Sequence, residues 1–317
     1  MDITSLRLFL RIAELGGIST AAQDLSLSPA SASARLNKLE EQLGARLFNR
    51  TTRAVSLTTH GEDFLPHVRE ALDALDTGAD ALVGRLQDPH GLLRMTMPGS
   101  FGRMYVVPLL AEFRRRYPRV DLDLRLSDEV LDVVGGAFDL IIRNAPLKDS
   151  NFVARRLAKD RRVLVAAPDY LERRGRPLQI DDLRQHDCIG FQHRSTWEFQ
   201  TGETIGIECP VVMNEGEAMR QFIEAGGGIG IKSLWNAAHS LRSGALVEVL
   251  PDKPLVTRSA IWMVYPSHRM VPQKVRAMVA FLEEAFSPST PWDPRGTDSP
   301  MESPSSTSSV NPDPQSD

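Results

Sequence analysis

The chain has 317 residues, of which 42% are hydrophobic and 25% charged, as in an ordinary globular protein long enough for two domains. No stretch approaches the roughly 18 apolar residues of a membrane span, and Asp2 stands where an export signal would carry positive charge. Two cysteines are too few for a disulfide framework. These features predict a cytoplasmic protein with no membrane partner.

A net charge of −4 would argue against nucleic-acid binding if the negative charge were spread along the whole chain, but it is concentrated near the C-terminus. Residues 288–317 carry one arginine against five acidic side chains, which accounts for the whole net charge. Residues 1–60 carry seven basic side chains against five acidic ones. The N-terminal part therefore has a small positive excess, which suits phosphate contacts.

The first 60 residues read as three short helices. Leu6, Phe9, Leu10 and Ala13 have the spacing of an amphipathic helix, which we expect to end at Gly16. We expect Ser19 to cap a second, short helix.

The third helix has the clearest start and stop signals. Ser28 is a typical N-cap, and Pro29 follows at the first helical position, where its missing N–H costs nothing. Gly44 stops the helix. Its predicted inward face consists of Ala32, Leu36, Leu39 and Leu43.

A longer helix is predicted after Gly61. Thr59 and Glu62 have the spacing of a capping box, and Pro66 predicts a bend or a late start. Apolar residues then recur at alternating steps of three and four, which is the pattern of a coiled-coil seam. A second copy of the chain is the simplest partner for this stripe, and packing on its own domain is the alternative. The seam consists of Leu65, Val68, Leu72, Leu75, Ala79, Leu82 and Leu86.

From Leu92 to about Phe286, short apolar runs alternate with helical stretches. The runs LLRMTM, VDLDLRL, FDLIIR and RRVLVAA read as strands, and VVPLLAEFRRRY and Val271–Phe286 as helices. This alternation predicts an α/β domain with a mainly parallel sheet that binds ligands outside the carboxyl ends of its strands. The Pro-, Ser- and Asp-rich segment after 286 is predicted to be disordered.

The residues now described resemble a known family. The segment LRLFLRIAELGGISTAAQDLSLSPASASARLNKLEEQLGARLFNRTTRAVSLTTHGE is similar to the DNA-binding domain of LysR-type regulators. The resemblance continues through FGRMYVVPLLAEFRRRYP, FDLIIR, DSNFVARRL and EAGGGIGIKSLW. It implies an all-α N-terminal winged helix-turn-helix and a two-lobed α/β effector domain like the type 2 periplasmic binding proteins. The implied partners are double-stranded DNA, a small-molecule effector and further copies of the chain, as a homodimer or homotetramer.

The resemblance also divides the chain and assigns its candidate sites. The expected parts are a DNA-binding domain (1–59), a linker and dimerisation helix (60–88), an effector domain (89–286) and a disordered tail (287–317). The DNA-binding candidates on the third helix and the wing are Ser31, Ser33, Ala34, Arg35, Asn37, Lys38, Arg50, Thr51 and Arg53. The wing read alone could equally be a solvated loop. The effector-binding candidates, expected at strand ends that face a cleft between the lobes, are Ser100, Phe101, Arg143, Asn144, Gly228 and Ile229.

Two positions depart from the family pattern. Ala34 stands where members often carry arginine, and it can touch a thymine methyl but cannot hydrogen-bond a base. Ala145 stands where glycine is usual, so a positive φ there would be strained.

Four groups of residues allow more than one interpretation. GGGIGIKS matches neither a P-loop nor GxGxxG, and the spacing of His186, Cys188 and His193 matches no zinc signature, which favours a structural role. Ser100 could hold an anionic or polar effector or serve as a simple N-cap, and Arg143 could pair with a ligand carboxylate or an internal one.

Three classes of function compete on this evidence. A cytoplasmic solute-binding protein would leave the first 60 residues unexplained. An enzyme would need a catalytic constellation, and none is visible, nor does any motif require a cofactor or metal. A ligand-responsive DNA-binding regulator explains every segment.

Overall fold

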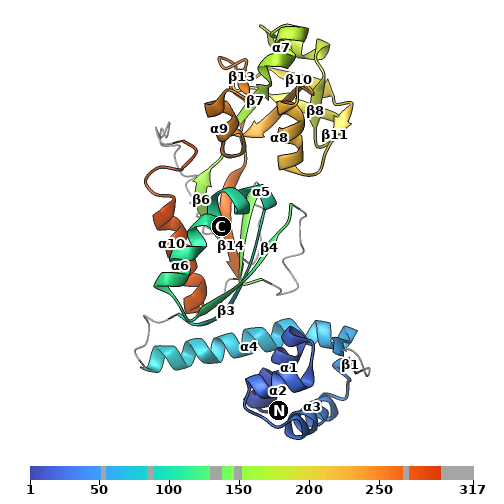
Figure 1. Cartoon of the computed structure of the whole chain (residues 1–317), viewed down its shortest axis with the longest axis vertical. Helices are drawn as coiled ribbons and strands as arrows, with labels where there is room; N and C mark the ends of the chain where they lie inside the picture. The colour runs from blue at the N-terminus through green and yellow to red at the C-terminus, as the bar shows by residue number, and fades with distance from the viewer. Residues whose placement is uncertain (51–54, 84–88, 129–137, 146–151, 267–270, 294–317) are drawn as a thin grey trace, which may run out of the picture.

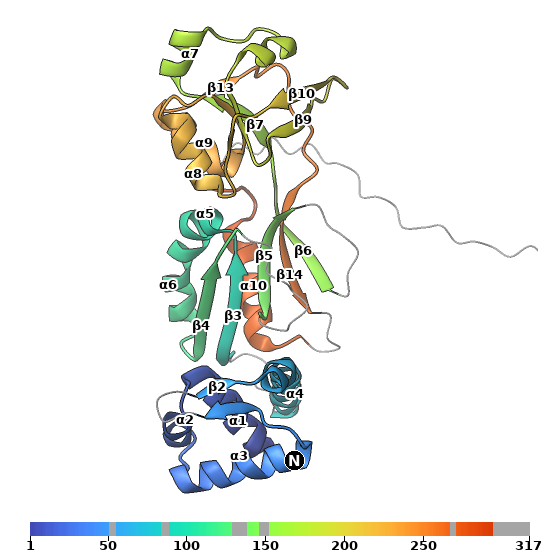
Figure 2. The ribbon, with the colours of Figure 1, turned by 90° about the vertical axis from the view of Figure 1, so that its right-hand side faces the viewer.

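The computed structural model describes residues 1–50, 55–83, 89–128, 138–145, 152–266 and 271–293, with the side chains of residues 50, 77 and 80–83 set aside. Three bodies follow one another along the long axis of the molecule (Figures 1 and 2). They are an N-terminal unit (residues 1–57), lobe I (91–159 and 260–293) and lobe II (162–256). Helix α4 lies between the N-terminal unit and lobe I. No helix in the described ranges is long and apolar enough to cross a membrane.

The N-terminal unit begins with the three expected helices, α1 (Ile3–Leu15), α2 (Ile18–Asp24) and α3 (Pro29–Leu43). Gly16 and Gly44 end α1 and α3 at φ values of 67° and 66°, where residues with a Cβ are disfavoured. Ser28 caps α3 as predicted and accepts the N–H of Ser31 at 3.2 Å.

Two details of the predicted helices are wrong. Gly17, not Ser19, occupies the N-cap of α2, because this helix begins at Ile18. Leu43 is 38% exposed, because the last turn of α3 projects past the core that Ala32, Leu36 and Leu39 fill.

A two-stranded wing follows α3. Its strands β1 (Phe48–Arg50) and β2 (Val55–Leu57) pair antiparallel. The carboxylate of Glu40 on α3 accepts the N–H groups of Leu47 and Phe48 at 2.8 and 3.2 Å. This contact holds the wing to α3.

Helix α4 (Thr59–Val83) starts without the predicted capping box and is continuous through Pro66. The hydroxyl of Thr58, one residue earlier than expected, accepts the N–H of Gly61 at 3.1 Å. The predicted seam divides in two. Val68 and Leu72 are buried in the core of the N-terminal unit, whereas Leu75 is 48% exposed. The first half of the seam therefore packs on its own domain, whereas Leu75 and Ala79 are open to a partner. The side chain of Leu82 and all of Leu86 lie outside the described residues.

Lobe I is built on a five-stranded sheet of order β4-β3-β5-β14-β6. Alternate side chains of β3 face the core of this lobe: Leu93, Met95 and Met97. Two helices complete the core with Phe113 and Phe281, whose ring centroids lie 5.3 Å apart. The strands are β3 (Gly91–Met97), β4 (Val120–Leu126), β5 (Leu140–Ala145), β6 (Phe152–Lys159) and β14 (Ala260–Pro266). The helices are α5 (Gly99–Phe101), a π-helical turn (Gly102–Val106), α6 (Val107–Arg116) and α10 (Gln273–Ala285).

Lobe II contains a second five-stranded sheet, of order β11-β8-β12-β7-β13. Along β7, Val163 and Val165 face one core and Leu164 and Ala166 face another, so the sheet is covered on both sides. The strands are β7 (Arg162–Ala166), β8 (Cys188–Gly190), β11 (Val211–Val212), β12 (Ile229–Ser233) and β13 (Val247–Val249), with a separate hairpin of β9 (Arg194–Glu198) and β10 (Thr204–Glu208). The helices are α7 (Pro168–Arg174), a 3-10 turn (Ile180–Gln185), α8 (Gly216–Glu224) and α9 (Leu234–Ser243).

Both five-stranded sheets differ from the predicted, mainly parallel arrangement. Each contains two parallel and two antiparallel pairings, because the chain crosses from lobe I to lobe II after β6 and returns before β14. The expected strain at Ala145 does not arise, since this residue ends β5 in register with Ala260. These two strand ends lie beside the crossings between the lobes.

Lobe I extends past the predicted boundary at residue 286. Trp292 is buried in its core, and its ring lies 4.7 Å from Tyr105 and 5.7 Å from Phe286. The predicted start of the disordered tail, residue 287, is therefore too early. The large aromatic side chain of Trp292 packs into the apolar core although its neighbours in the sequence are polar. The remainder of that tail, 294–317, is outside the described residues.

Candidate DNA-binding and effector sites

The outward face of α3 lies at the end of the molecule, away from α4 and both lobes (Figures 1 and 2). Ala34, Asn37 and Lys38 are exposed there, and Ser33 is half-buried. Neither Asn37 nor Lys38 makes a hydrogen bond or ion pair with another described residue. Both side chains are therefore available to an external partner.

The side chains on the flank of this face are less available to an external partner. Ser31 is half-buried beside its cap, and a guanidinium nitrogen of Arg35 lies 3.6 Å from the carboxylate of Asp2. The Nε of Arg35 is buried without a hydrogen-bond partner. Of the predicted wing residues, Arg50 ends β1 and its side chain is not described, while Thr51 and Arg53 lie outside the described residues.

The junction between the two lobes contains Ser100 and Asp128, an acidic residue that the sequence analysis did not predict. One carboxylate oxygen of Asp128, just after β4, accepts the N–H of Gly99 at 2.7 Å, and the other lies 3.4 Å from the N of Gly216 at the start of α8. Asp128 therefore bridges lobe I to lobe II. Ser100 is buried close by, and its Oγ would lie 3.9 Å from a Cβ on Gly216. Pro98 holds the N-cap position, so Ser100 is not a simple N-cap.

Cationic groups stand beside this carboxylate. Arg103 of lobe I lies 3.4 Å from Glu215 of lobe II. The ammonium of Lys232 on β12 donates to the carbonyl of Gly216 at 2.5 Å, and burial lowers the pKa of Lys232 to about 8. This junction thus combines a hydroxyl, N–H groups and an ammonium, which can bind a carboxylate or another polar oxygen.

Phe101 lies in the core of lobe I rather than in the cleft. Its ring contacts Trp235 edge-on at 5.3 Å, and the hydroxyl of Tyr105 donates to the carbonyl of Trp235 at 2.6 Å. These contacts join lobe I to the first turn of α9. Phe101 is therefore an apolar support beneath Ser100, because the helical turn directs the two neighbouring side chains apart.

Arg143 and Asn144 cannot both face the cleft, because successive side chains of a strand point to opposite faces. The amide of Asn144 donates to Asp160 at 3.2 Å and to Ser233 at 3.1 Å, and is thus engaged where the lobes join. Arg143 also has an interaction partner within the chain.

Gly228 and Ile229 were predicted to bind the effector between the lobes, but they lie at the end of lobe II that is far from lobe I (Figure 1). Helix α8 runs away from the cleft, and the glycine turn leads into β12, whose other end carries Lys232. Gly228 has a φ of 140°, and a Cβ there would lie 2.1 Å from the carbonyl of Asp187. The turn requires glycine for close packing within lobe II.

A buried carboxylate ties together the segments that cross between the lobes. Asp160 lies between β6 and β7, and its Oδ2 accepts hydrogen bonds from Ser233 at 3.0 Å and Ser259 at 2.9 Å. The same oxygen lies 3.0 Å from the Nε of Arg162, whose backbone N–H donates to Thr257 at 3.1 Å. With Asn144, this hinge network (residues 144, 160, 162, 233, 257 and 259) joins both lobes and both crossing segments.

The three possible metal ligands make separate contacts. His186 Nδ1 lies 3.2 Å from the hydroxyl of Tyr170, and burial lowers the pKa of His186. Cys188 is buried, which raises its pKa to about 12, and His193 Nδ1 lies 3.1 Å from the carbonyl of Cys209. In the described ranges, no three such side chains gather into a metal site.

Two family models match the chain in agreement with this geometry. "Bacterial regulatory helix-turn-helix protein, lysR family" matches residues 3–62, and "LysR substrate binding domain" matches residues 86–287. The chain belongs to the LysR family. It is a DNA-binding transcriptional regulator of the LysR type with a domain that responds to a small-molecule effector.

Named relatives of this LysR-family regulator are similar over nearly their whole length. The HTH-type transcriptional regulator DmlR of Escherichia coli K12 is 32% identical over 292 residues, covering 90% of this chain and 94% of DmlR. An HTH-type transcriptional regulator of Xanthomonas campestris is 36% identical, covering 89% and 84%. The solved structure of CrgA, a LysR-type regulator from Neisseria meningitidis, is 27% identical with a TM-score of 0.59, covering 90% and 99%.

Only part of each candidate site of this LysR-type regulator could be predicted from its sequence. The α3 face followed from helical periodicity and cap signals. Asp128, Lys232 and Asp160 were missed because no motif marks them and their partners are distant in the chain. A position just after β4, at the carboxyl end of a strand, was the one available signal for Asp128.

Proposed function

We propose that this regulator reads its operator with the outward face of α3, binds its effector between the lobes, and acts in the cytoplasm as an oligomer assembled through α4. One observation supports the DNA-binding face most. Asn37 and Lys38 are exposed on a capped helix at the end of the molecule (Figure 2), and neither forms a hydrogen bond or ion pair with another described residue. Ser33 and Arg35 extend the same face. Asn and Lys donate to base edges and phosphates, respectively.

The Lys38→Ala variant tests the DNA-binding face. The loss of one phosphate contact lowers the slope of log K against log salt concentration by about 1, and a lost base contact relaxes sequence preference. Mobility-shift titrations at several salt concentrations, on duplexes that the wild-type chain selects from a random pool, measure both effects. The control is Arg194→Ala, which removes the same charge from the 87% exposed side chain in lobe II. Equal slopes for both variants would contradict the proposed face.

The effector site is proposed at Ser100, Lys232 and the N–H groups of Gly99 and Gly216. Asp128 now accepts those N–H groups, so an effector carboxylate has to compete with an internal carboxylate. An effector changes the balance between lobe arrangements only by its different affinity for each of them.

A thermal-shift screen with small carboxylates, aromatic compounds and amino acids identifies an effector, because a ligand selective for the folded state raises the unfolding temperature. The Ser100→Ala variant is then expected to bind that effector about 3- to 10-fold more weakly, the effect of losing one hydrogen bond. Isothermal titration of wild type and variant measures the ratio. Undiminished affinity would place the ligand outside the proposed site.

A further inference from the structure

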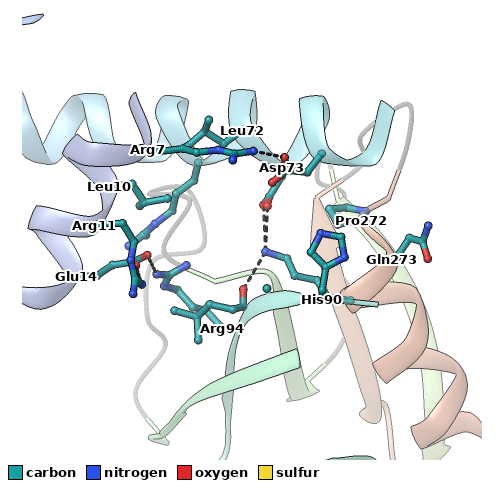
Figure 3. A pocket seen from close by; sticks show the side chains of 15 residues that line it. Arg7, Leu10, Arg11, Glu14, Leu72, Asp73, His90, Arg94, Pro272 and Gln273 are labelled. Carbon is teal, nitrogen blue, oxygen red and sulfur yellow. Dashed lines mark hydrogen bonds and ion pairs between the residues drawn. The ribbon is translucent and has the colours of Figure 1, made fainter. Parts of the chain in front are cut away.

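A separate cavity of about 200 Å³ lies where the N-terminal unit, α4 and lobe I meet (Figure 3). It belongs to neither candidate site. Its walls come from α1 and α4 on one side and from β3 and the start of α10 on the other. Most of its lining side chains are charged, which is unusual for a small, partly open space between domains. The charged lining residues are Arg7, Arg11, Glu14, Arg69, Asp73, Asp76, Arg94 and Lys274.

Four of the five cations in this lining have carboxylate partners. Two of these pairs cross from the N-terminal unit or α4 to lobe I: Glu14 with Arg94, whose side chains are 13% and 9% exposed, and Asp73 with Lys274 at 3.1 Å (Figure 3). The other two pairs lie within the N-terminal part, Arg7 with Asp76 at 2.7 Å and Arg11 with Asp24 at 2.7 Å.

Arg69 is the exception. It makes no hydrogen bond or ion pair within the described residues, and its Nε is buried without a hydrogen-bond partner. Burial lowers the pKa of Arg69, and the positive charge of Arg94 adds to this effect. The carboxylates of Glu14, Asp139 and Asp73 oppose it from beyond ion-pair distance. Arg69 is half-buried, a cation that loses hydration without a direct partner is costly, and arginine stays charged in proteins. Among the described residues, no carboxylate therefore pairs directly with the guanidinium of Arg69.

We propose that this cavity is a second ligand site, which binds a small oxyanion on the guanidinium of Arg69. The planar guanidinium matches the two oxygens of a carboxylate or phosphate group. The volume is below the roughly 300–1,000 Å³ of drug-sized ligand pockets, so the ligand has few atoms beyond the oxyanion itself. Because the walls belong to different bodies, a bound anion stabilises the packing of the N-terminal unit and α4 on lobe I.

The test compares Arg69→Met with Arg115→Met, a matched control at an exposed position of α6. Thermal unfolding of the full chain is followed against sodium acetate and against sodium phosphate, at an ionic strength held constant with a bulky buffer anion. Wild type and Arg115→Met are expected to show a saturable rise in unfolding temperature. Arg69→Met is expected to require at least about tenfold more anion for the same rise.

The Arg69→Met variant also distinguishes a ligand-binding arginine from a purely structural one. Without anion, Arg69→Met is expected to unfold at the same temperature as wild type or higher, because it removes a half-buried charge that has no direct ion-pair partner. A lower temperature would overturn the proposal. So would an equal saturable rise in Arg69→Met, which would locate the anion elsewhere, or no saturable rise in wild type. A stronger response to phosphate or to acetate identifies which oxyanion the site prefers.

Discussion

The Leu72→Asp variant is expected to lose the fold of its N-terminal unit, rather than only its self-association. Leu72 is buried with Val68 against the α1–α3 core and also borders the charged cavity of Figure 3, so an aspartate there replaces apolar contacts with a carboxylate between that core and the cavity. The free energy of unfolding should fall by about 3–5 kcal/mol, from the lost leucine contacts and the buried charge. All four tryptophans lie in the lobes. Urea unfolding should therefore show helical circular dichroism lost early while tryptophan fluorescence stays native.

Leu75→Asp is the matched control on the same helix. Leu75 is 48% exposed and follows the buried half of the seam, so the variant should retain the helical signal. If the exposed half of α4 forms the interface between copies, Leu75→Asp should sediment as a smaller species than wild type. A Leu72→Asp variant that unfolds like wild type would contradict the packing of α4 on its own domain. A Leu75→Asp variant that sediments like wild type would remove α4 as the interface.

Asp160→Ala is expected to have the largest effect within the effector domain. Its carboxylate is fully buried and accepts from Asn144, Ser233 and Ser259 beside the Arg162 ion pair. Alanine removes the acceptor that these donors and the guanidinium share at the point where the two crossing segments meet. Breaking a buried, hydrogen-bonded ion pair costs about 3–5 kcal/mol. Urea titration followed by tryptophan fluorescence measures the change.

Asp169→Ala provides the comparison for this measurement. Asp169 pairs with Arg173 on the surface of α7, and its side chain is 70% exposed. Removing an exposed ion pair should change the free energy of unfolding by less than about 1 kcal/mol. If the two variants unfolded at the same urea concentration, the hinge network would not hold the lobes together.

The sequence predicted those parts of the fold that depend on neighbours in the chain. Ser28, Pro29 and Gly44 mark α3 because a cap hydroxyl, a fixed φ and a left-handed turn act within one helical turn. The strands β3, β4, β5 and β7 followed in the same way from short apolar runs. The outward face of α3, with Asn37 and Lys38, needed only helical periodicity.

Contacts between residues distant in the sequence decided the rest. The periodicity of α4 marks Leu72 and Leu75 alike, and only the packing of the N-terminal unit buries the first and exposes the second. The sequence predicted that the glycine turn at Gly228 borders a cleft, whereas the direction of α8 and β12 places this turn at the far end of lobe II. Asp128, Asp160 and Arg69 carry no sequence motif, because their environments arise where separate elements meet. Periodicity and caps thus determined the elements of this protein, and tertiary packing alone decided which charged groups are buried together, because that depends on three-dimensional distance.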